Sequence, residues 1–399
     1  MKLHSTETFW PIKNAMDTSY PSLNADITTP ILIIGGGITG ALIAYKLITE
    51  GKKVTLVDKR DICNGSTAAS TALLQYEIDI SLHQLIEKRG FDCAVSSYKN
   101  CEKAIFDLKK IIDSIKSDCQ FEFKKSVYFC SVKKDIPFLE REFKARKENG
   151  FKIKWLDEIE LKKQGINGFV AIESESGAVM DPYKLAYDLL KYCTQKGMQI
   201  YDRTNIIAFK QQNGKTLAIT EDKFTITTEN SIHCSGYEST QTLTEKVVDL
   251  KSTYALASES FTKVPEVFKN AIYWNTSEPY LYFRATSDNR IIMGGGDEEF
   301  HNPEKRDKLL PRKESYLLKQ FKKCFPDIKF KLDYSWAGTF GETQDALPYF
   351  GKPDSQKKEH YVLGFGGNGI TFSVMAMNSI IASLNGTPHQ DLEYYKFNR

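Results

Sequence analysis

An apolar block opens the first regular part of the chain. Residues 31–34 are consecutive apolar positions, a pattern typical of a strand buried on both faces. Apolar residues at helical spacing follow over 38–50, and Gly51 ends that segment. A second apolar strand covers 54–57 and stops at Asp58. The pattern predicts a β-α-β unit of a parallel sheet with an acid at the tip of its second strand.

Hydrophobic spacing along the rest of the chain mixes predicted helices and strands. Helical spacing covers 81–117, 135–148, 182–194, 313–324 and 372–384. Apolar runs predict strands at 121–131, 151–156, 199–201, 206–209, 216–220, 224–227, 231–234 and 361–365, and antiparallel strands over 251–296 with a turn at 287–289. Residues 1–28 are polar and predict an irregular lead-in. Because no linker divides the chain, we expect a discontinuous α/β domain that the chain leaves and re-enters.

The turn after the first strand carries the spacing Gly35-x-Gly37-x-x-Gly40. Gly35 permits a tight turn, Gly37 lets the backbone approach a pyrophosphate, and Gly40 lets the helix pack close to the strand. The helix N-terminus offers free N–H groups to phosphates, and Asp58 can accept a hydrogen bond from a ribose hydroxyl. Together they predict a dinucleotide site; the alternative is a glycine turn that binds no nucleotide.

A second glycine-dense segment, 364–371, lies between a predicted strand and a predicted helix. Glycines let backbone amides approach a flat or anionic ligand, and Thr371 is a candidate cap of the helix. A helix N-terminus aimed at the pyrimidine end of a flavin would stabilise the negative charge that grows there on reduction. The alternative is a plain loop before a core helix.

Composition narrows the class of protein. The 399 residues are 41% hydrophobic and 26% charged, ordinary for a soluble globular chain, and the net charge of +3 is too small to predict a nucleic-acid partner. Eight cysteines without a CxxC motif and six scattered histidines predict reduced thiols and no metal site. No signal peptide or membrane span is evident in the sequence, so we expect a cytoplasmic protein.

An ordered set of motifs resembles the D-amino-acid oxidase-like (DAO) family of FAD-dependent oxidoreductases, which includes glycine oxidase, sarcosine oxidase and γ-glutamylputrescine oxidoreductase. The motifs are IIGGGITG with VDK, GSTAASTALL, MDPYKLAYDLL, HCSGYES, YLYFRATSDNRIIMGGG, WAGTFGETQDALPYFG and GFGGNGIT. The resemblance implies a Rossmann-like FAD-binding lobe and an antiparallel-sheet substrate lobe. It places the FAD-binding domain at 29–118, 175–245 and 335–399, and the substrate-binding domain at 119–174 and 246–334.

The resemblance also implies which residues meet a non-covalently bound FAD. Gly35, Gly37, Ile38, Thr39 and Gly40 would meet the pyrophosphate. The other implied contacts are Asp58 and Lys59 at the adenosine ribose, Ser66, Thr67, Ser70 and Thr71 along the diphosphate and ribityl chain, Ile206 at the adenine, Gly236 where a strand returns to the cofactor, and Gly367, Asn368, Gly369, Ile370 and Thr371 at the isoalloxazine.

Two positions depart from the family pattern. Phe340 stands where glycine oxidase and D-amino-acid oxidase have an Arg that clamps the substrate carboxylate, and Phe cannot imitate that bidentate fork. Gly338 stands where sarcosine oxidase attaches its flavin through a Cys, so covalent attachment there is not expected. Because Phe340 lacks the Arg fork, a simple amino acid is a doubtful substrate.

One strand offers candidates for substrate positioning. Alternation places Tyr280, Tyr282 and Arg284 on the same face of the segment YLYFRA. A cation at Arg284 could bind a carboxylate in place of the missing Arg. The alternative is a structural ion pair of Arg284 with Asp288 or Asp297.

Other side chains have two interpretations each. Tyr254 is a candidate pocket wall or a core residue, and Glu77 could meet a substrate amine or form a surface salt bridge. His233 is expected to be a core histidine, and Arg290 and Asp297 are further candidates for the site.

We therefore expect a flavin enzyme that oxidises a C–N bond of an amine or amino acid by hydride transfer to flavin N5, giving an imine that hydrolyses. Its partners would be that small molecule and oxygen or another electron acceptor. The alternatives are a non-catalytic or differently specialised FAD-fold binding protein, an oxidoreductase acting on a 2-hydroxy acid, and a tRNA-modifying oxidoreductase, which the weak net charge argues against.

Overall fold

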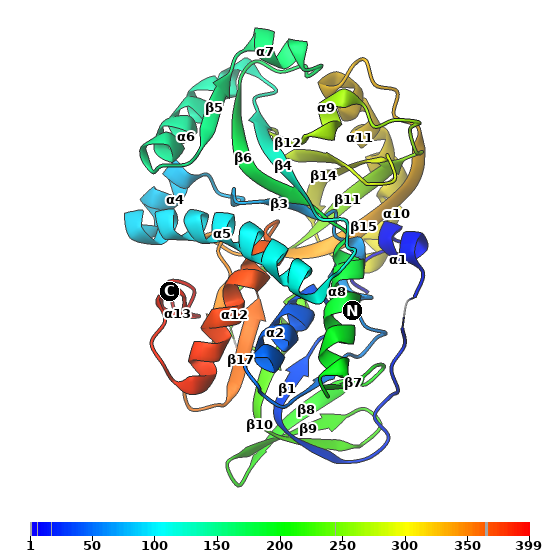
Figure 1. The fold of residues 1–399 in the computed structure, drawn as a ribbon, viewed down its shortest axis with the longest axis vertical. Coiled ribbons are helices and arrows are strands. Elements are labelled where there is room, and N and C mark those ends of the chain that lie inside the picture. Colours follow the sequence, from blue (N-terminus) through cyan, green and yellow to red (C-terminus); the bar gives the residue numbers. More distant parts are fainter. Residues whose placement is uncertain (1, 6, 17, 244, 364–365) are drawn as a thin grey trace.

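Two sheets, one above the other along the long axis, organise the molecule (Figure 1). The computed structural model describes residues 2–5, 7–16, 18–243, 245–363 and 366–399. The first, eight-stranded sheet has the order β16-β17-β10-β1-β2-β7, with the β8–β9 hairpin attached to β10. We call it and its helices the parallel-sheet lobe. Its strands are β1 (Ile27–Ile34), β2 (Val54–Val57), β7 (Gln199–Tyr201), β8 (Ile206–Gln212), β9 (Lys215–Thr220), β10 (Thr225–His233), β16 (Tyr349–Gly351) and β17 (Glu359–Leu363).

The second, nine-stranded sheet has the order β15-β11-β14-β13-β12-β4-β6-β3, with β5 attached to β6. All its neighbours are antiparallel except β12 and β4. We call it and its helices the antiparallel-sheet lobe. Its strands are β3 (Leu73–Gln75), β4 (Glu122–Phe129), β5 (Ile153–Leu156), β6 (Ala171–Val179), β11 (Asp249–Ser258), β12 (Ala271–Asn275), β13 (Leu281–Ala285), β14 (Ile291–Glu299) and β15 (Leu332–Glu342).

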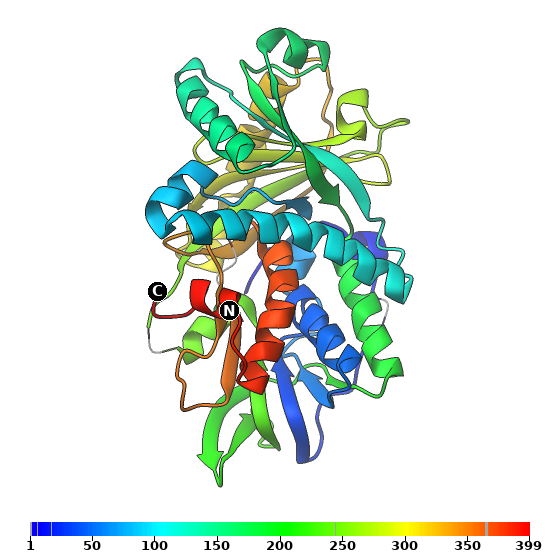
Figure 2. The ribbon, with the colours of Figure 1, turned by 60° about the vertical axis from the view of Figure 1, so that its left-hand side comes forward.

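Helices cover both sheets, and the long α5 (Phe91–Ile115) crosses between the lobes (Figure 2). α2 (Ile38–Thr49), α8 (Pro182–Gln195) and α12 (Gly369–Asn385) lie against the first sheet. The others are α1 (Phe9–Asn14), α3 (Ser66–Ala69), α4 (Leu82–Arg89), α6 (Ile136–Glu148), α7 (Glu158–Lys163), α9 (Glu266–Lys269), α10 (Pro303–Lys308), α11 (Leu310–Cys324) and α13 (Gln390–Tyr394), with 3-10 turns at Lys133–Asp135 and Gly236–Thr242.

The register of the first sheet lines up three strand ends. β1 pairs in parallel with β2 and β10, so that Ile34, Val57 and His233 lie side by side. The Gly35 amide donates to the Val57 carbonyl at 2.8 Å, and the Cys234 amide donates to the Ile34 carbonyl at 2.8 Å. The carboxyl ends of parallel strands are where α/β sheets bind ligands, so this edge positions the site.

The mixed α/β fold with two sheets is the predicted one, but several details differ. The lead-in is not wholly irregular, because α1 forms there and buries Phe9 and Trp10. The helix predicted over 81–117 is two helices separated at Gly90. β3, the end of β6 and most of β15 belong to the second sheet, although the expected boundaries put them in the FAD-binding domain. Residues 364–365, part of a predicted strand and of the second glycine segment, lie outside the described residues.

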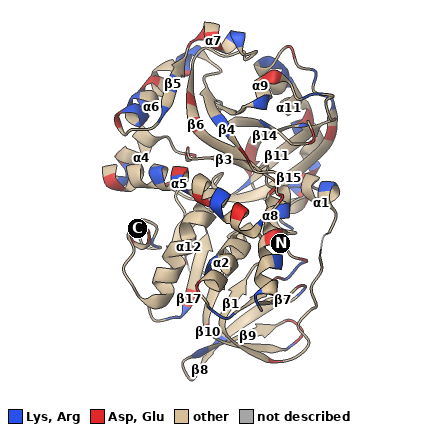
Figure 3. Ribbon diagram, viewed as in Figure 1, with Lys and Arg blue, Asp and Glu red and all other residues tan. Residues whose placement is uncertain are grey.

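Apolar packing explains the central helices. α12 carries no charged residue and α2 carries one lysine, and both belong to the largest hydrophobic cluster. Charges of both signs mix on the outer helices α5, α6 and α7 (Figure 3). All eight cysteines are buried and free. Within the described part of the chain, no helix is both long enough and apolar enough to cross a membrane.

Candidate functional site

A cavity of about 370 Å³ runs from the carboxyl ends of β1, β2 and β10 to the second sheet. Of the residues predicted to meet a cofactor, all except Gly40 line it. Its walls also include Leu3, Arg60, Asp79, Thr204, Phe209, His233, Tyr237, Glu238, Thr253, Tyr280, Tyr282, Asp297, Thr339 and Phe340. The cavity therefore joins the two glycine segments across more than 300 residues of sequence.

The first glycine turn is fixed by close backbone contacts. Gly35 has φ +109°, and a Cβ there would lie 2.6 Å from the Cys234 carbonyl oxygen. A Cβ on Gly40 would lie 1.9 Å from the Gly35 oxygen, so this glycine serves helix packing and does not line the cavity. A Cβ on Gly37 would lie 2.9 Å from the Thr67 hydroxyl. This close contact agrees with the packing role predicted for Gly40 from the fingerprint, and its contact with a pyrophosphate stays a prediction.

One end of the cavity, which we call the nucleotide end, contains acids that the protein itself satisfies. Asp58 accepts hydrogen bonds from the Gly36 amide at 2.7 Å and the Arg60 amide at 2.8 Å. Burial raises the pKa of Asp58 to about 6, and these two amides oppose the shift. Glu238 receives Lys59 at 2.6 Å and Arg60 at 3.0 Å, and these partners lower its pKa against the effect of burial.

The two helix N-termini meet in the middle of the cavity wall. α2 begins after Gly37 with no side-chain cap, and the Thr67 hydroxyl accepts from the Ile38 amide at 2.9 Å. The Thr39 hydroxyl on α2 lies 2.8 Å from the Ser373 hydroxyl on α12. The ends of both macrodipoles therefore border one cavity, an arrangement that favours negative charge there.

The second glycine segment contacts the extension of β3. The Gly367 amide donates to Asp79 Oδ2 at 2.6 Å, and the Asn368 side chain donates to the Glu77 carbonyl at 2.8 Å. α12 begins at Gly369, so Thr371 is inside the helix and donates to the Asn368 carbonyl at 2.9 Å. The predicted cap is therefore wrong: Asn368 holds the N-cap position, without a capping side chain.

The other end, which we call the substrate end, gathers tyrosines and carboxylates. Tyr280 donates to Asp79 Oδ1 at 3.1 Å, and Tyr282 lies against Gly294. Burial raises the pKa of Asp297 to about 7, with Asp79 contributing in the same direction and Thr253 opposing. Burial likewise raises the pKa of Asp79. Phe340 lines this cavity from β15.

Two of the three residues predicted to position a substrate lie elsewhere. Arg284 is buried behind the cavity wall, where its guanidinium donates to the carbonyls of Thr71, Ala72 and Met180 at 2.7 to 3.0 Å. Burial without a carboxylate partner lowers its pKa to about 10. Tyr254 is fully buried outside the cavity lining. Tyr282 alone of the three lines the cavity.

The remaining candidates separate into core and site. Glu77 is neither exposed nor in the cavity lining; it forms a buried ion pair with Arg146 at 3.1 Å. Arg290 pairs with Asp288 at 3.0 Å in the β13–β14 turn. His233 is a core histidine stacked on Tyr361 at 4.2 Å, and burial lowers its pKa to about 3. His233 is also one of the residues that line the cavity.

Sequence reasoning missed Asp79 and Glu238 and gave Asp297 little weight. Glu238 meets Lys59 across 179 positions and Asp79 meets Gly367 across 288, so no local spacing could show either contact. The one available signal is that Asp297 ends the glycine-rich run 294–296. Among the described residues, no group of three or more His, Cys, Asp or Glu is arranged to hold a metal ion.

The model of the DAO family, described as FAD dependent oxidoreductase, matches residues 30–378. γ-Glutamylputrescine oxidoreductase of Escherichia coli is 24% identical over 405 residues, covering 95% of this chain and 90% of that protein. Glycine oxidase from Geobacillus kaustophilus has a TM-score of 0.81 at 16% identity, covering 94% of this chain and 99% of that one. L-α-Glycerophosphate oxidase from Mycoplasma pneumoniae, with FAD bound, has a TM-score of 0.76 at 17% identity, covering 90% and 95%.

Proposed function

Because the chain belongs to the DAO family of FAD-dependent oxidoreductases, we propose that it oxidises the C–N bond of an amine that carries no carboxylate anchor. The observation that carries this proposal is the substrate end of the cavity. Among the described lining residues, the only lysine and arginine are Lys59 and Arg60, and both lie at the nucleotide end. A carboxylate or phosphate at the other end would meet Asp79, Asp297 and Phe340 instead of a cation.

The residues present fit FAD. A Cβ at Gly37 or Gly35 would close the turn beside the cavity, and the N-termini of α2 and α12 border the same space. Gly37, Ile38 and Thr39 would hold the pyrophosphate, Asp58 and Lys59 the ribose, Ile206 the adenine, and Gly367 to Thr371 the ring end. The chemistry that bound FAD supplies is acceptance of a hydride from the carbon of a C–N bond, which leaves an imine for water to hydrolyse.

The side chains of this chain position the amine and limit water. Tyr280, Tyr282 and Phe340 give the substrate end aromatic walls, which pack against the carbon chain of an amine and limit the access of water. Tyr280 is held by Asp79, so its ring is oriented before a substrate arrives. No lysine or histidine base is needed for an amine that binds neutral.

The same end of the cavity argues against other substrates of oxidoreductases. A 2-hydroxy acid or a glycerophosphate needs a cation for its charged group, and the described lining offers none there. We therefore rank alkyl amines above amino acids, hydroxy acids and phosphate esters as candidate substrates.

Anaerobic reduction of the purified, FAD-loaded protein tests the proposal. Absorbance of the oxidised flavin should fall when an alkyl amine is added, and should change far less with glycine, lactate or glycerol 3-phosphate. Reduction by lactate or glycerol 3-phosphate alone would reassign the substrate. Bound flavin that dithionite reduces and no amine reduces would favour a non-catalytic binding protein.

A further inference from the structure

Asp297 is a carboxylate with one oxygen that lacks a partner in the described part of the chain, although the Thr253 hydroxyl bonds to the carboxylate and acts to lower its pKa. Asp297 ends the apolar part of β14 and lines the substrate end of the cavity. Its Oδ1 is shielded from solvent and has no hydrogen-bond partner among the described residues. A shielded carboxylate of this kind is costly unless something compensates its charge. Asp297 therefore marks a place where a group from outside the chain can complete the site.

The nearby cations of the protein are already engaged. Lys313 binds Glu298 at 2.6 Å and the Gly296 carbonyl at 2.6 Å, and its charge acts to lower the pKa of Asp297, although no ion pair among the described residues joins the two side chains. Lys251 lies 3.9 Å from both Glu299 and Glu342. Asp79 and Glu342 also act on Asp297, and both raise its pKa. The field at the substrate end is negative, which favours a positively charged ligand.

A second cavity, of about 270 Å³, continues this acidic character. It shares Asp79 with the main cavity and is also lined by Asp249 and Glu342. Asp249 is paired with Lys246 at 2.5 Å, whereas Asp79 is held only by the Gly367 amide and the Tyr280 hydroxyl among the contacts of the described residues. Carboxylates therefore line both cavities, and Asp79 lies at their shared boundary.

We propose that Asp297 binds a second, non-reacting ammonium group of the substrate, so that the enzyme selects diamines or longer polyamines over monoamines and amino acids. The inference rests on the proposed function and deepens it. The nitrogen next to the carbon that loses the hydride has to be neutral. We therefore assign the carboxylate at this site to a second, charged nitrogen of the same molecule. Asp79, which lines both cavities, offers that ammonium, or a third one, a further contact.

Binding to the FAD-loaded protein under anaerobic conditions tests this site apart from turnover. The probes are 1,4-diaminobutane, butylamine and 4-aminobutanoate, which share a four-carbon chain and differ in the distal group. Calorimetry should give a Kd for the diamine at least about 10-fold below that of butylamine, and weaker binding still for 4-aminobutanoate. Equal affinities for the three probes, or a preference for the carboxylate, would overturn the proposal.

Substitution assigns the preference to its residue. Asp297→Asn keeps the shape and should raise the diamine Kd about 10-fold or more while leaving the butylamine Kd within about 2-fold. The matched control is Glu299→Gln, which removes an exposed carboxylate from the same strand outside the cavity lining and should leave all three values unchanged. Unaltered selectivity in Asp297→Asn, with normal flavin content, contradicts the proposal. FAD-loaded protein that binds the diamine, but whose flavin no amine reduces, contradicts only the proposed function.

Discussion

The two ends of the cavity treat their charges in opposite ways. At the nucleotide end, Asp58 receives two backbone amides and Glu238 receives Lys59 and Arg60. At the substrate end, Asp297 Oδ1 receives nothing from the described residues, and Phe340 contributes an uncharged ring to the lining. The first end is complete as folded, whereas the second is complete only with a ligand.

This difference separates residues that build a rigid cradle from residues that are left available to a ligand. A resident cofactor needs a rigid cradle, so its end is built from glycines, caps and paired charges. A transient substrate needs complementary charge that the protein leaves open, at a cost in folding free energy. The predictions below test the two ends in turn.

The largest effect is expected at the nucleotide end. Gly40→Ala would place a Cβ 1.9 Å from the Gly35 oxygen, and neither backbone can move without breaking the turn. We expect a destabilisation of about 5 kcal/mol and protein purified without flavin. Flavin absorbance per protein and urea unfolding measure both. Thr49→Ala, at the exposed end of the same helix, should keep its flavin; normal flavin in Gly40→Ala would remove the packing argument.

Asp297, at the substrate end, predicts that the free energy of unfolding depends on pH. Burial raises the pKa of Asp297 from 3.8 to about 7, so the folded state holds a proton that the unfolded state has already lost between these values. Asp297 therefore costs stability as pH rises from about 4 to 7, and the cost then stays constant. Asp79, Glu342 and Lys313 are the charged groups that act on it.

Asp297→Asn removes that dependence. Between pH 4 and pH 8, the free energy of unfolding of the variant should gain on the natural protein by as much as about 4 kcal/mol. Urea unfolding at the two pH values measures the change, with Glu299→Gln as the control. A difference that does not grow with pH would mean that Asp297 is ionised without penalty.

Arg284 tests whether a residue behind the cavity wall supports the fold or binds the substrate. Its side chain donates to the carbonyls of Thr71, Ala72 and Met180. Arg284→Met should therefore cost about 3 kcal/mol of folding free energy by leaving them unpaired. Flavin content should fall, and the KM for an amine should stay unchanged in the molecules that retain flavin. Arg141→Met, on the exposed face of α6, is the control. A raised KM with full stability would return Arg284 to the substrate site.

The sequence predicted the parts that depend on local pattern. The β1-α2-β2 unit, the strands and the helix at α12 follow from apolar spacing, and the glycine fingerprint follows from turns that only glycine can make. Each of these signals lies within a window of about thirty residues, so it can be recognised in a single sequence.

The open end could not be predicted in the same way. Strand alternation correctly put Tyr280, Tyr282 and Arg284 on one face, but only Tyr280 and Tyr282 reach the cavity because Arg284 turns to the carbonyls beside β3. Asp79 and Asp297 come together through contacts between distant strands, and an acid in a sequence shows neither its burial nor its partners. The sheets also do not follow the expected domain segments, because β3, the end of β6 and most of β15 pair in the second sheet with strands distant in sequence.

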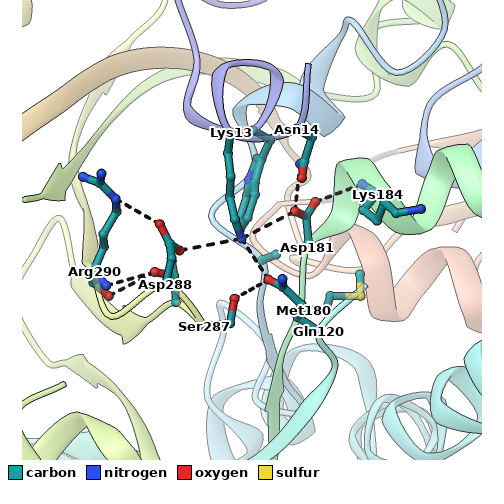
Figure 4. A network of polar contacts seen from close by, with 12 residues as sticks. Lys13, Asn14, Gln120, Met180, Asp181, Lys184, Ser287, Asp288 and Arg290 are labelled. Carbon is teal, nitrogen blue, oxygen red and sulfur yellow. Dashed lines mark hydrogen bonds and ion pairs between the residues drawn. The ribbon is translucent and has the colours of Figure 1, made fainter. Parts of the chain in front are cut away.

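The smallest effect is expected at α1, which ties the two lobes behind the cavity. Lys13 lies between Asp181 at 3.9 Å and Asp288 at 3.7 Å and donates to Gln120 at 2.8 Å (Figure 4). Asp181 caps α8 in one lobe, and Asp288 sits in the β13–β14 turn of the other. Since Asp288 is partly exposed, Lys13→Met should cost only about 1 kcal/mol. The loss should shrink in 1 M salt, where surface charges are screened. Urea unfolding at low and high salt measures it, with the exposed Lys52→Met as control; an effect that salt does not alter would assign the role of Lys13 to packing on Trp10, whose ring lies 5.3 Å from its Nζ.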